Sequence, residues 1–403
     1  MRRRPAGGGV VLIIVQNLPV PFDRRVWLEC QSLVARGFQV AVVCPKGPGD
    51  PGYQLLEGVH LYKYRPSPAT QSKLSFIREF LTSFTATLWL TLKVWRRHGI
   101  AAIQACNPPD IFWPIGLLFQ PAGVPFVYDQ HDLCPELYES RFPDGARLPH
   151  RFLLALERAT YRTARHVIST NESYRRAAIR RGKKHADDIT IVRTGPDPDR
   201  LRRGAPVPEH LRGGRFLAVY IGVMGPQDGV DYAIRAAAHV KHGLSRHDIT
   251  FTLIGSGDSF EELQQLAHDL DVDDIVHFTG RAPDQLVAEL MSTAHVGLSP
   301  DPKNALNDVS TMNKTMEYMA YELPVLAFDL VETRVSAQDA AVYVRPNDVA
   351  AYGDAIVELV DDPDRRSWLG KLGRERVEDV LAWSHQAARY VSVYERLLGE
   401  REV

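Results

Sequence analysis

Short apolar runs alternate with amphipathic stretches through the first half of the chain. The run VVLIIV at residues 10–15 is followed by a helix-like stretch ending at Gly37, which can cap a helix, and then by FQVAVVCP. The next apolar runs are AAIQAC, PFVYDQ, RHVIST and DITIVRTG. Strands separated by helical patterns are typical of βαβ units, in which helices cover both faces of a parallel sheet.

The second half repeats this rhythm after a polar stretch rich in Pro and Gly, residues 196–214, where we place a linker. Helical patterns over 229–240 and 259–270 separate the runs FLAVYIG, ITFTLIGSG and IVHFTG, and HVGLSP, PVLAFD and AVYVRP follow. A Pro-free amphipathic pattern near the end predicts a last helix over 385–403. The sequence therefore predicts an α/β protein with two doubly wound Rossmann-like domains, residues 1–205 and 206–384.

Length, composition and charge agree with two globular domains. A chain of 403 residues and 45.2 kDa exceeds what one hydrophobic core usually supports. With 45% apolar and 24% charged residues it is neither disordered, collagen-like nor a coiled coil. Residues 1–200 hold 28 Lys+Arg against 17 Asp+Glu, whereas the remainder holds 20 against 32. A basic half and an acidic half suggest different partners for each domain.

Cysteine spacing and hydropathy indicate where the protein works. The four cysteines lie far apart without a C-x-x-C pair, which favours a reduced, cytoplasmic setting and no structural zinc. The apolar run at 10–15 is too short for the core of a signal peptide. The longest candidate span, residues 80–95, contains Lys93 and falls short of the ~20 apolar residues that crossing a bilayer requires.

The stretch 304–329 carries the richest chemistry. Ser310 and Thr311 can cap a helix from about Met312 to Tyr321, and the N–H groups at such a start favour a bound phosphate. Lys314 lies in the first turn, where the helix dipole disfavours a cation unless an anion binds there. Helical spacing places Asn313, Lys314 and Glu317 together, with Glu317 one turn on and able to accept hydrogen bonds from two sugar hydroxyls.

Strand-end loops elsewhere supply further candidates. Glycines that permit close backbone approach to a base or phosphate follow two strands of the second half: Gly222, Gly225, Gly255 and Gly257. In the first half, FVYDQHDL places Asp129, His131 and Asp132 at a strand end. The loop after the first strand holds Asp23, Arg24 and Arg25, of which either arginine can meet a phosphate or be a solvated helix-start residue.

Taken together, these segments resemble the retaining family-4 glycosyltransferases, which have the two-domain GT-B fold. The similarity is narrower to the branch of bacterial polysaccharide and natural-product enzymes. It covers essentially the whole chain, through QNLPVPFDRRVWLECQSL, YDQHDLCPELY, VISTNESY, VRTGPD, YIGVMGPQDGVDYAIRAA, LIGSGD, FTGR and the 304–329 stretch, in that order. The resemblance implies two domains facing each other across a cleft, with the last helix crossing back to the first domain.

The same resemblance implies roles for particular residues. Glu317 matches the second glutamate of the family's paired motif and would hold the nucleotide ribose. His131 would lie beside the reacting sugar, and Asp23, Arg24, Arg25 and Asp132 would face the acceptor. Ser310, Thr311, Asn313 and the four glycines would line the donor, and Lys314 would act on the leaving diphosphate.

Three departures from the family pattern accompany these roles. The first motif glutamate falls on Val309, so either neighbouring Asp308 serves through a one-residue shift or the donor sugar is held differently. The Arg and Lys that usually neutralise the diphosphate are replaced by Val223 and Asp228, which leaves Lys314, the helix start and Arg281 to act instead. Glu322 stands where a glycine normally ends the helix, at a cost of ~1 kcal/mol if its backbone is left-handed.

The implied reaction transfers a sugar from a nucleoside diphosphate donor, most simply a UDP-sugar, to a hydroxyl of a saccharide, lipid-linked or natural-product acceptor. No Asp-x-Asp stands directly at a strand end, so a bound metal is not required. We also expect no tightly bound cofactor and no nucleic acid partner. Two rivals remain: a GT-B epimerase or phosphorylase, and a degenerate nucleotide-sugar-binding or scaffold protein. Assays of UDP or GDP release and of nucleotide binding separate them.

The stretch 73–97 has a bulky apolar face with basic ends. It predicts either a helix packed on its own domain, the simpler interpretation, or peripheral contact with a membrane, which the basic first half would favour. The basic set Arg175, Arg176, Arg180, Arg181, Lys183 and Lys184 could join that contact or form a solvated helix face.

Overall fold

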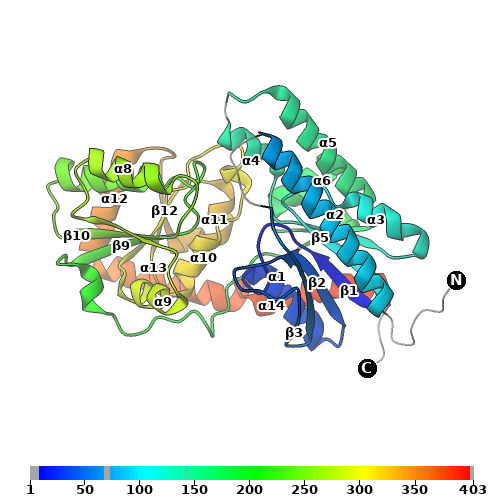
Figure 1. Cartoon of the computed structure of the whole chain (residues 1–403). Coiled ribbons are helices and arrows are strands. Elements are labelled where there is room, and N and C mark those ends of the chain that lie inside the picture. The colour runs from blue at the N-terminus through cyan, green and yellow to red at the C-terminus, as the bar shows by residue number, and fades with distance from the viewer. Residues whose placement is uncertain (1–8, 68–72, 143, 400–403) are drawn as a thin grey trace. The chain divides into compact units, whose positions relative to one another are not determined.

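The computed structural model describes residues 9–67, 73–142 and 144–399, which form two units (Figure 1). The N-terminal unit contains residues up to Tyr138, Asp144–Thr194 and the chain from Ser384 onward. The C-terminal unit contains Gly195–Trp383 with the short segment Glu139–Pro143. Of the predicted last helix, over 385–403, the described residues 385–399 thus fall in the unit formed by the first half of the chain, and 400–403 lie outside the described residues.

The N-terminal sheet has the strand order β3-β4-β2-β1-β5-β6-β7-β8, and every neighbouring pair is parallel except β3 and β4. The strands are β1 Val10–Ile14, β2 Val40–Pro45, β3 Tyr53–Leu56, β4 Val59–Tyr64, β5 Ile100–Cys106, β6 Phe126–Gln130, β7 His166–Ser169 and β8 Ile189–Ile191. The helices are α1 Arg24–Ala35, α2 Lys73–His98, α3 Trp113–Phe119, α4 Cys134–Arg141, α5 Arg147–Thr163, α6 Glu172–Gly182 and α14 Trp383–Leu398.

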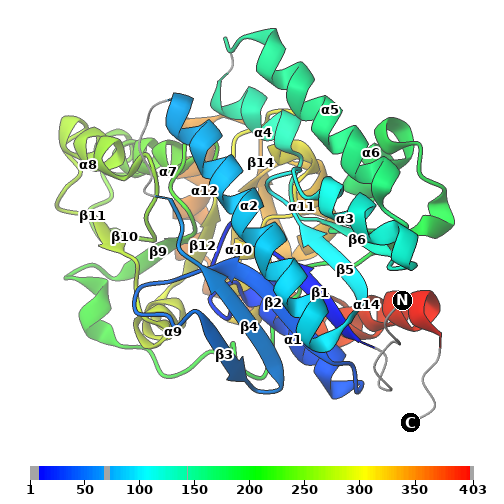
Figure 2. The same ribbon diagram turned by 45° about the vertical axis from the view of Figure 1, so that its right-hand side comes forward.

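Helices cover both faces of this sheet. Alternate residues of β1, Val10, Leu12 and Ile14, pack into one core with side chains of α2, α3 and α5. Figure 2 shows α2 lying across that face. Helix α14 lies beside α1, and Glu395 of α14 pairs with Arg36, which follows α1, at 2.6 Å.

The antiparallel hairpin β3–β4 was not predicted. Its two-residue turn, Glu57-Gly58, has positive φ at both positions, as a tight hairpin requires. The Glu-Gly pair between the runs YQLL and VHLYKY is a turn signal that an interpretation by βαβ units alone does not use.

The C-terminal sheet is parallel throughout, in the order β11-β10-β9-β12-β13-β14. The strands are β9 Phe216–Ile221, β10 Ile249–Ile254, β11 Val276–Gly280, β12 Val296–Ser299, β13 Val325–Phe328 and β14 Ala341–Val344. The helices are α7 Val230–Ala238, α8 Phe260–Asp269, α9 Asp284–Thr293, α10 Asn313–Ala320, α11 Val331–Ala337, α12 Val349–Asp361 and α13 Pro363–Arg376.

The period-2 pattern of β9 divides the core of this unit between two faces. Ala218 and Tyr220 pack with α7, α8 and α12, whereas Leu217 and Val219 pack with α9 and α10. Two parallel Rossmann-like α/β sheets therefore confirm the predicted fold class.

The boundary between the units lies earlier than the predicted one at residue 205. The stretch expected to be a linker is tied to the C-terminal unit by hydrogen bonds. Gly204 N donates to Ser292 Oγ at 2.9 Å and Val207 N donates to Thr293 Oγ1 at 2.9 Å. Polar, Pro-rich composition predicted loop structure here, but it did not reveal that the loop is anchored to α9.

Candidate functional site

Most of the candidate side chains lie in loops at the carboxyl ends of neighbouring strands, or at the start of the helix that follows. In the C-terminal unit these strands are β10, β9 and β12, which are adjacent in the sheet. In the N-terminal unit β1 and β6 both pair with β5. Parallel strands end at one edge, and ligands of open α/β sheets bind there.

Lys314 lies in the first turn of α10 and is paired in a nearly buried environment. Its Nζ lies 2.5 Å from Oδ1 of Asp301, and the two side chains are 9% and 1% exposed. The ammonium also lies 5.3 Å from the centre of the Tyr220 ring, a cation–π contact. Asp301 Oδ2 accepts a hydrogen bond from Ser299 Oγ at 2.8 Å. The predicted phosphate-binding cation is thus held in place by a carboxylate that the sequence analysis did not identify.

A second carboxylate lies in the same neighbourhood. Asp228 occupies a position where the resemblance implied a cation, and its Oδ2 accepts hydrogen bonds from Gly225 N at 2.8 Å and Gln227 Nε2 at 3.1 Å. Burial raises the pKa of Asp228 to about 6; Asp301 adds to this rise and Lys314 opposes it. The other substituted position, Val223, is 60% exposed.

The start of α10 differs from the prediction. The N-cap residue is Met312, which makes no side-chain cap, so the expectation that Ser310 and Thr311 cap this helix is wrong. Ser310 Oγ instead donates to Leu306 O at 2.8 Å, because residues 307–309 form a short 3₁₀ turn just before it. Glu322 does adopt the left-handed conformation after the helix, with φ 57°.

The other donor-side candidates occupy different environments. Asn313 is exposed at the first position of α10, and Glu317 is half-buried one turn after it. Arg281 is exposed directly after β11. Asp308 accepts a hydrogen bond from Val331 N at 3.0 Å and pairs with Lys303 at 3.3 Å, so its carboxylate fixes the start of α11. This engagement gives Asp308 a structural task, and its catalytic role toward the donor sugar stays a prediction.

The glycines are explained by close packing between loops. Gly222 N donates to Ile254 O and Met224 N donates to Ser256 O, which joins the loops after β9 and β10. A Cβ on Gly255 would lie 1.8 Å from Gly222 O, and one on Gly257 would lie 2.5 Å from Met224 O. Neither position can accept a side chain. Gly222 and Gly225 belong to the same joined loops.

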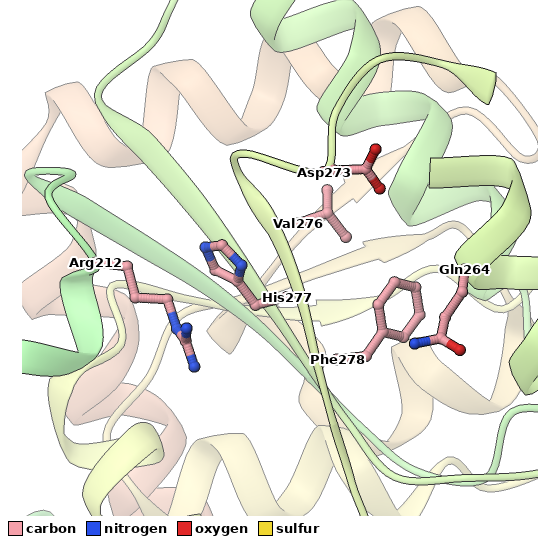
Figure 3. Close-up of a pocket in the computed structure, with 6 residues that line it drawn as sticks. All are labelled: Arg212, Gln264, Asp273, Val276, His277 and Phe278. Carbon is pink, nitrogen blue, oxygen red and sulfur yellow. The ribbon is translucent and has the colours of Figure 1, made fainter. Parts of the chain in front are cut away.

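The pocket of about 280 Å³ in Figure 3 lies away from these residues, along β11. It is lined by Arg212, Gln264, Asp273, Val276, His277 and Phe278. His277 and Phe278 are consecutive strand residues and point to opposite sides of β11 in Figure 3. Because β11 is the edge strand, we interpret this pocket as a surface groove of the sheet edge.

In the N-terminal unit, the strand ends bring together a buried group of ionic and polar side chains. Arg25 is 6% exposed, and its Nη2 donates to Asp129 Oδ1 at 3.0 Å. Its Nη1 donates to Val192 O and to Thr194 Oγ1, both at 3.0 Å. Because its guanidinium is buried, Arg25 is not the solvated helix-start residue of one of the two options left open for it, and its predicted contact with a phosphate or acceptor stays a prediction.

His131 lies at the edge of this group, with 18% of its side chain exposed. Its Nε2 lies 2.6 Å from Asp129 Oδ2 and 3.0 Å from Arg25 Nε. Asn107 fixes the backbone here, because its Oδ1 accepts hydrogen bonds from His131 N at 2.7 Å and Asp132 N at 3.1 Å. The structure therefore brings His131 together with Arg25 and Asp129 of the predicted loops.

The remaining acceptor-side candidates lie nearer to solvent. Asp23 is the N-cap of α1 and accepts a hydrogen bond from Val26 N at 3.1 Å. Arg24 is exposed and Asp132 is half-buried. The acceptor-side roles of Arg24 and Asp132 stay predictions.

Asp129 is held by buried hydrogen-bonding residues that the sequence analysis missed. Gln104 Nε2 donates to Asp129 Oδ2 at 3.0 Å and to Glu29 Oε2 at 2.8 Å. Gln104 Oε1 accepts hydrogen bonds from Tyr390 at 2.7 Å and from Tyr394, both in α14. The one available signal was a polar residue, Gln104, within the apolar run AAIQAC.

Cys106, Asp129 and His131 offer ligand atoms within 4.8 Å of one another, a spacing that can suit a metal ion. The Arg25 guanidinium contacts two of the three, and a second cation there would be repelled. Burial also raises the pKa of the Cys106 thiol, which disfavours the thiolate that a metal binds. These residues therefore do not fit a metal, and Arg25 supplies the positive charge.

Known proteins are similar to this chain along most of its length. Residues 23–195 match the family model described as "Glycosyl transferase 4-like domain", and residues 215–362 match "Glycosyl transferases group 1". D-inositol 3-phosphate glycosyltransferase of Thermomonospora curvata is 26% identical over 90% of this chain and 88% of its own.

Solved structures share the fold. Sucrose-phosphate synthase of Thermosynechococcus elongatus superposes with a TM-score of 0.78 at 19% identity, over 98% of this chain and all of that one. HepE of Anabaena in complex with UDP and glucose gives 0.74 at 15% identity, over 96% and 100%. The fold and the family matches define a GT-B glycosyltransferase. The chain belongs to the family-4 glycosyltransferases and is a sugar-transferring enzyme, as predicted, and neither rival function is favoured.

Proposed function

We propose that this glycosyltransferase takes its sugar from a nucleoside diphosphate donor, a UDP-sugar, and transfers it with retention to a hydroxyl of a saccharide, lipid-linked or natural-product acceptor. The observation that carries the proposal is Lys314. A lysine in the first turn opposes the helix dipole, and this one is also nearly buried against Asp301. An anionic ligand at the start of α10 would turn that unfavourable placement into a favourable one.

The charge balance around Lys314 determines how a diphosphate would be held. Asp301 already neutralises Lys314, and Asp228 places a carboxylate where the resemblance implies a cation. Binding of the donor therefore requires Lys314 to be shared between Asp301 and phosphate, together with protonation of Asp228. Backbone N–H groups at residues 310–313 and the exposed Arg281 supply further positive potential.

Catalysis in this proposal rests on charge stabilisation and positioning rather than on an enzymic nucleophile. The acceptor hydroxyl attacks the face that the diphosphate leaves, and Lys314 stabilises the departing charge. Glu317 holds the ribose and His131 bonds a hydroxyl of the donor sugar. The UDP choice is supported by the UDP and glucose bound to the Anabaena neighbour.

The test is a panel of UDP- and GDP-sugars with pooled acceptors, followed by mass spectrometry of the products. We expect UDP release with one donor, and an NMR coupling constant that reports an unchanged anomeric configuration. Glu317→Ala should abolish transfer with the melting temperature unchanged. Lys303→Ala is the control, because that lysine is 45% exposed and pairs at the surface with Asp308. Wild-type turnover by Glu317→Ala would overturn the assignment of the donor site.

We also propose that the protein works in the cytoplasm and contacts the membrane surface through α2. None of the described helices is long and apolar enough to cross a bilayer. Leu81 and Trp89 on α2 are 59% and 62% exposed, and Trp89 adjoins a groove of about 390 Å³ that it forms with Lys93, Arg96 and Arg97. An indole beside three cations suits the headgroup region of an anionic membrane.

Sedimentation with vesicles of anionic or neutral lipid tests this contact. We expect the protein to bind anionic vesicles and the binding to weaken as salt is added. The double variant Trp89→Ser with Lys93→Ser should bind these vesicles at least tenfold more weakly. Equal binding of that variant and the wild type would exclude α2 as the contact. The alternative, a helix that only packs on its own unit, predicts no vesicle binding.

A further inference from the structure

The hydrogen bonds around His131 Nε2 decide which ring nitrogen can serve the substrate. Nε2 has two close neighbours, Asp129 Oδ2 at 2.6 Å and Arg25 Nε at 3.0 Å. It cannot donate to the first and accept from the second in the same state, since one nitrogen of a neutral imidazole either carries the proton or offers the lone pair.

The ionisation of Asp129 resolves this conflict. Burial alone would raise its pKa, but the charges of Arg25 and His131 and the hydrogen bonds from both hold the pKa of Asp129 well below its ordinary value. An ionised carboxylate only accepts, so Nε2 must carry the proton. The N–H of Arg25 Nε is fixed in the guanidinium plane, so it cannot donate to a protonated Nε2 and stays a close neighbour at 3.0 Å; Glu29 Oε1 lies 3.1 Å from Arg25 Nε without a hydrogen bond.

The surroundings hold Asp129 in this orientation. Burial, followed by the charge of Asp129, raises the pKa of Glu29, which favours a neutral Glu29 and leaves Asp129 as the negative group beside His131. The Gln104 amide cannot turn over, because Oε1 faces the hydroxyls of Tyr390 and Tyr394 while Nε2 faces the two carboxyl groups. Hydrogen bonds through Asp129 and Gln104 thus connect His131 to the tyrosines of helix α14.

We infer that Asp129 is a positioning residue that fixes His131 with Nε2 protonated, so that Nδ1 meets the substrate as a hydrogen-bond acceptor. The inference rests on the proposed role of His131 beside the reacting sugar. A bare Nδ1 selects a donating hydroxyl, whereas the opposite tautomer would present an N–H and require an accepting atom. Asp129 therefore sets the direction of the hydrogen bond between enzyme and sugar.

The test measures the tautomer directly, by ¹⁵N NMR of the full chain labelled at histidine, with the His131 signals identified by their loss in His131→Gln. We expect the wild type to show a protonated Nε2 and a bare Nδ1. Asp129→Asn can present an N–H instead of a carboxylate, so it should shift His131 toward the Nδ1–H form. With it, kcat/KM should fall about 10- to 100-fold, the effect of one charge-assisted hydrogen bond.

Asp110→Asn is the matched control, because Asp110 is also a buried carboxylate of this unit, 3% exposed and bonded to Tyr128 at 2.6 Å. It should leave the His131 tautomer unchanged. A wild-type enzyme with Nδ1–H and bare Nε2 overturns the inference even if Asp129→Asn fails to fold. An unchanged tautomer in Asp129→Asn overturns it as well. Full activity of His131→Gln would instead refute the proposed role of His131, whatever its tautomer.

Discussion

We expect Lys314 to have two separable roles, in stability and in chemistry, which substitutions at positions 314 and 301 can distinguish. In Lys314→Met the Asp301 carboxylate, 1% exposed, loses its only described ion-pair partner at 2.5 Å. Breaking a buried pair by removing one member costs about 3–5 kcal/mol, because the other charge is left without compensation. The hydrogen bond from Ser299 to Asp301 remains in the variant and still stabilises the carboxylate, so we expect a cost of about 3 kcal/mol.

For a unit of about 200 residues, each kcal/mol shifts the melting temperature by about 2–4 °C. Lys314→Met should therefore melt about 6–12 °C below the wild type. The double variant Lys314→Met with Asp301→Asn leaves no buried charge, and the asparagine amide oxygen can still accept the hydrogen bond from Ser299, so most of this loss should be recovered. Transfer should stay at least about 100-fold down in both variants, because the leaving diphosphate has lost its cation.

The assay pairs thermal melting with UDP release on the same samples. The nearby pair Lys303–Asp308 is the control, with side chains 45% and 26% exposed. Lys303→Met should cost no more than about 1 kcal/mol and leave turnover unchanged. The reasoning is refuted if the double variant folds and turns over within threefold of the wild type. It is also refuted if Lys314→Met melts like the wild type, since the ion pair would then carry no energy.

Three further predictions follow from the C-terminal loops and the Arg25 group. Since the pKa of Asp228 is raised from 3.8 to about 6, the folded protein binds this proton more tightly, and stability falls as pH rises from about 4 through 6. Asp228→Asn should remove this loss of stability, so that the variant is about 1–3 kcal/mol more stable than the wild type at pH 7 in denaturant melts. The variant should also show a smaller fall of the donor KM between pH 7.5 and 5.5, and an unchanged pH profile would contradict this. Gly255→Ala would place a Cβ 1.8 Å from Gly222 O and should prevent folding of the C-terminal unit, as measured by circular dichroism. The control Gly204→Ala, where Ser292 Oγ lies 3.5 Å from the added Cβ, should fold normally. EDTA should leave the initial rate unchanged, since Arg25 provides the charge that a metal would bring to Asp129; a rate restored only by added Mg²⁺ or Zn²⁺ would refute this.

Local patterns determined the architecture and the segments that carry the chemistry. Apolar runs with period-2 or helical spacing report burial along one element, so strands such as β1 and β9, and the segment of α10, followed from the sequence. The left-handed Glu322 and the crowded glycines at 255 and 257 were also foreseeable, because backbone geometry is read from residue type and position.

Pairing between ionisable groups was decided only by the tertiary structure. Arg25 meets Asp129, and Tyr390 meets Gln104, across separations that no local pattern encodes. Lys314 was visible as a misplaced cation, but its partner Asp301 was not, because β12 and α10 had first to be placed side by side. The sequence determines which side chains carry charge and which segments are buried. Whether a charge faces a ligand or a buried partner depends on which strand ends become neighbours, and burial then sets the strength of each pair.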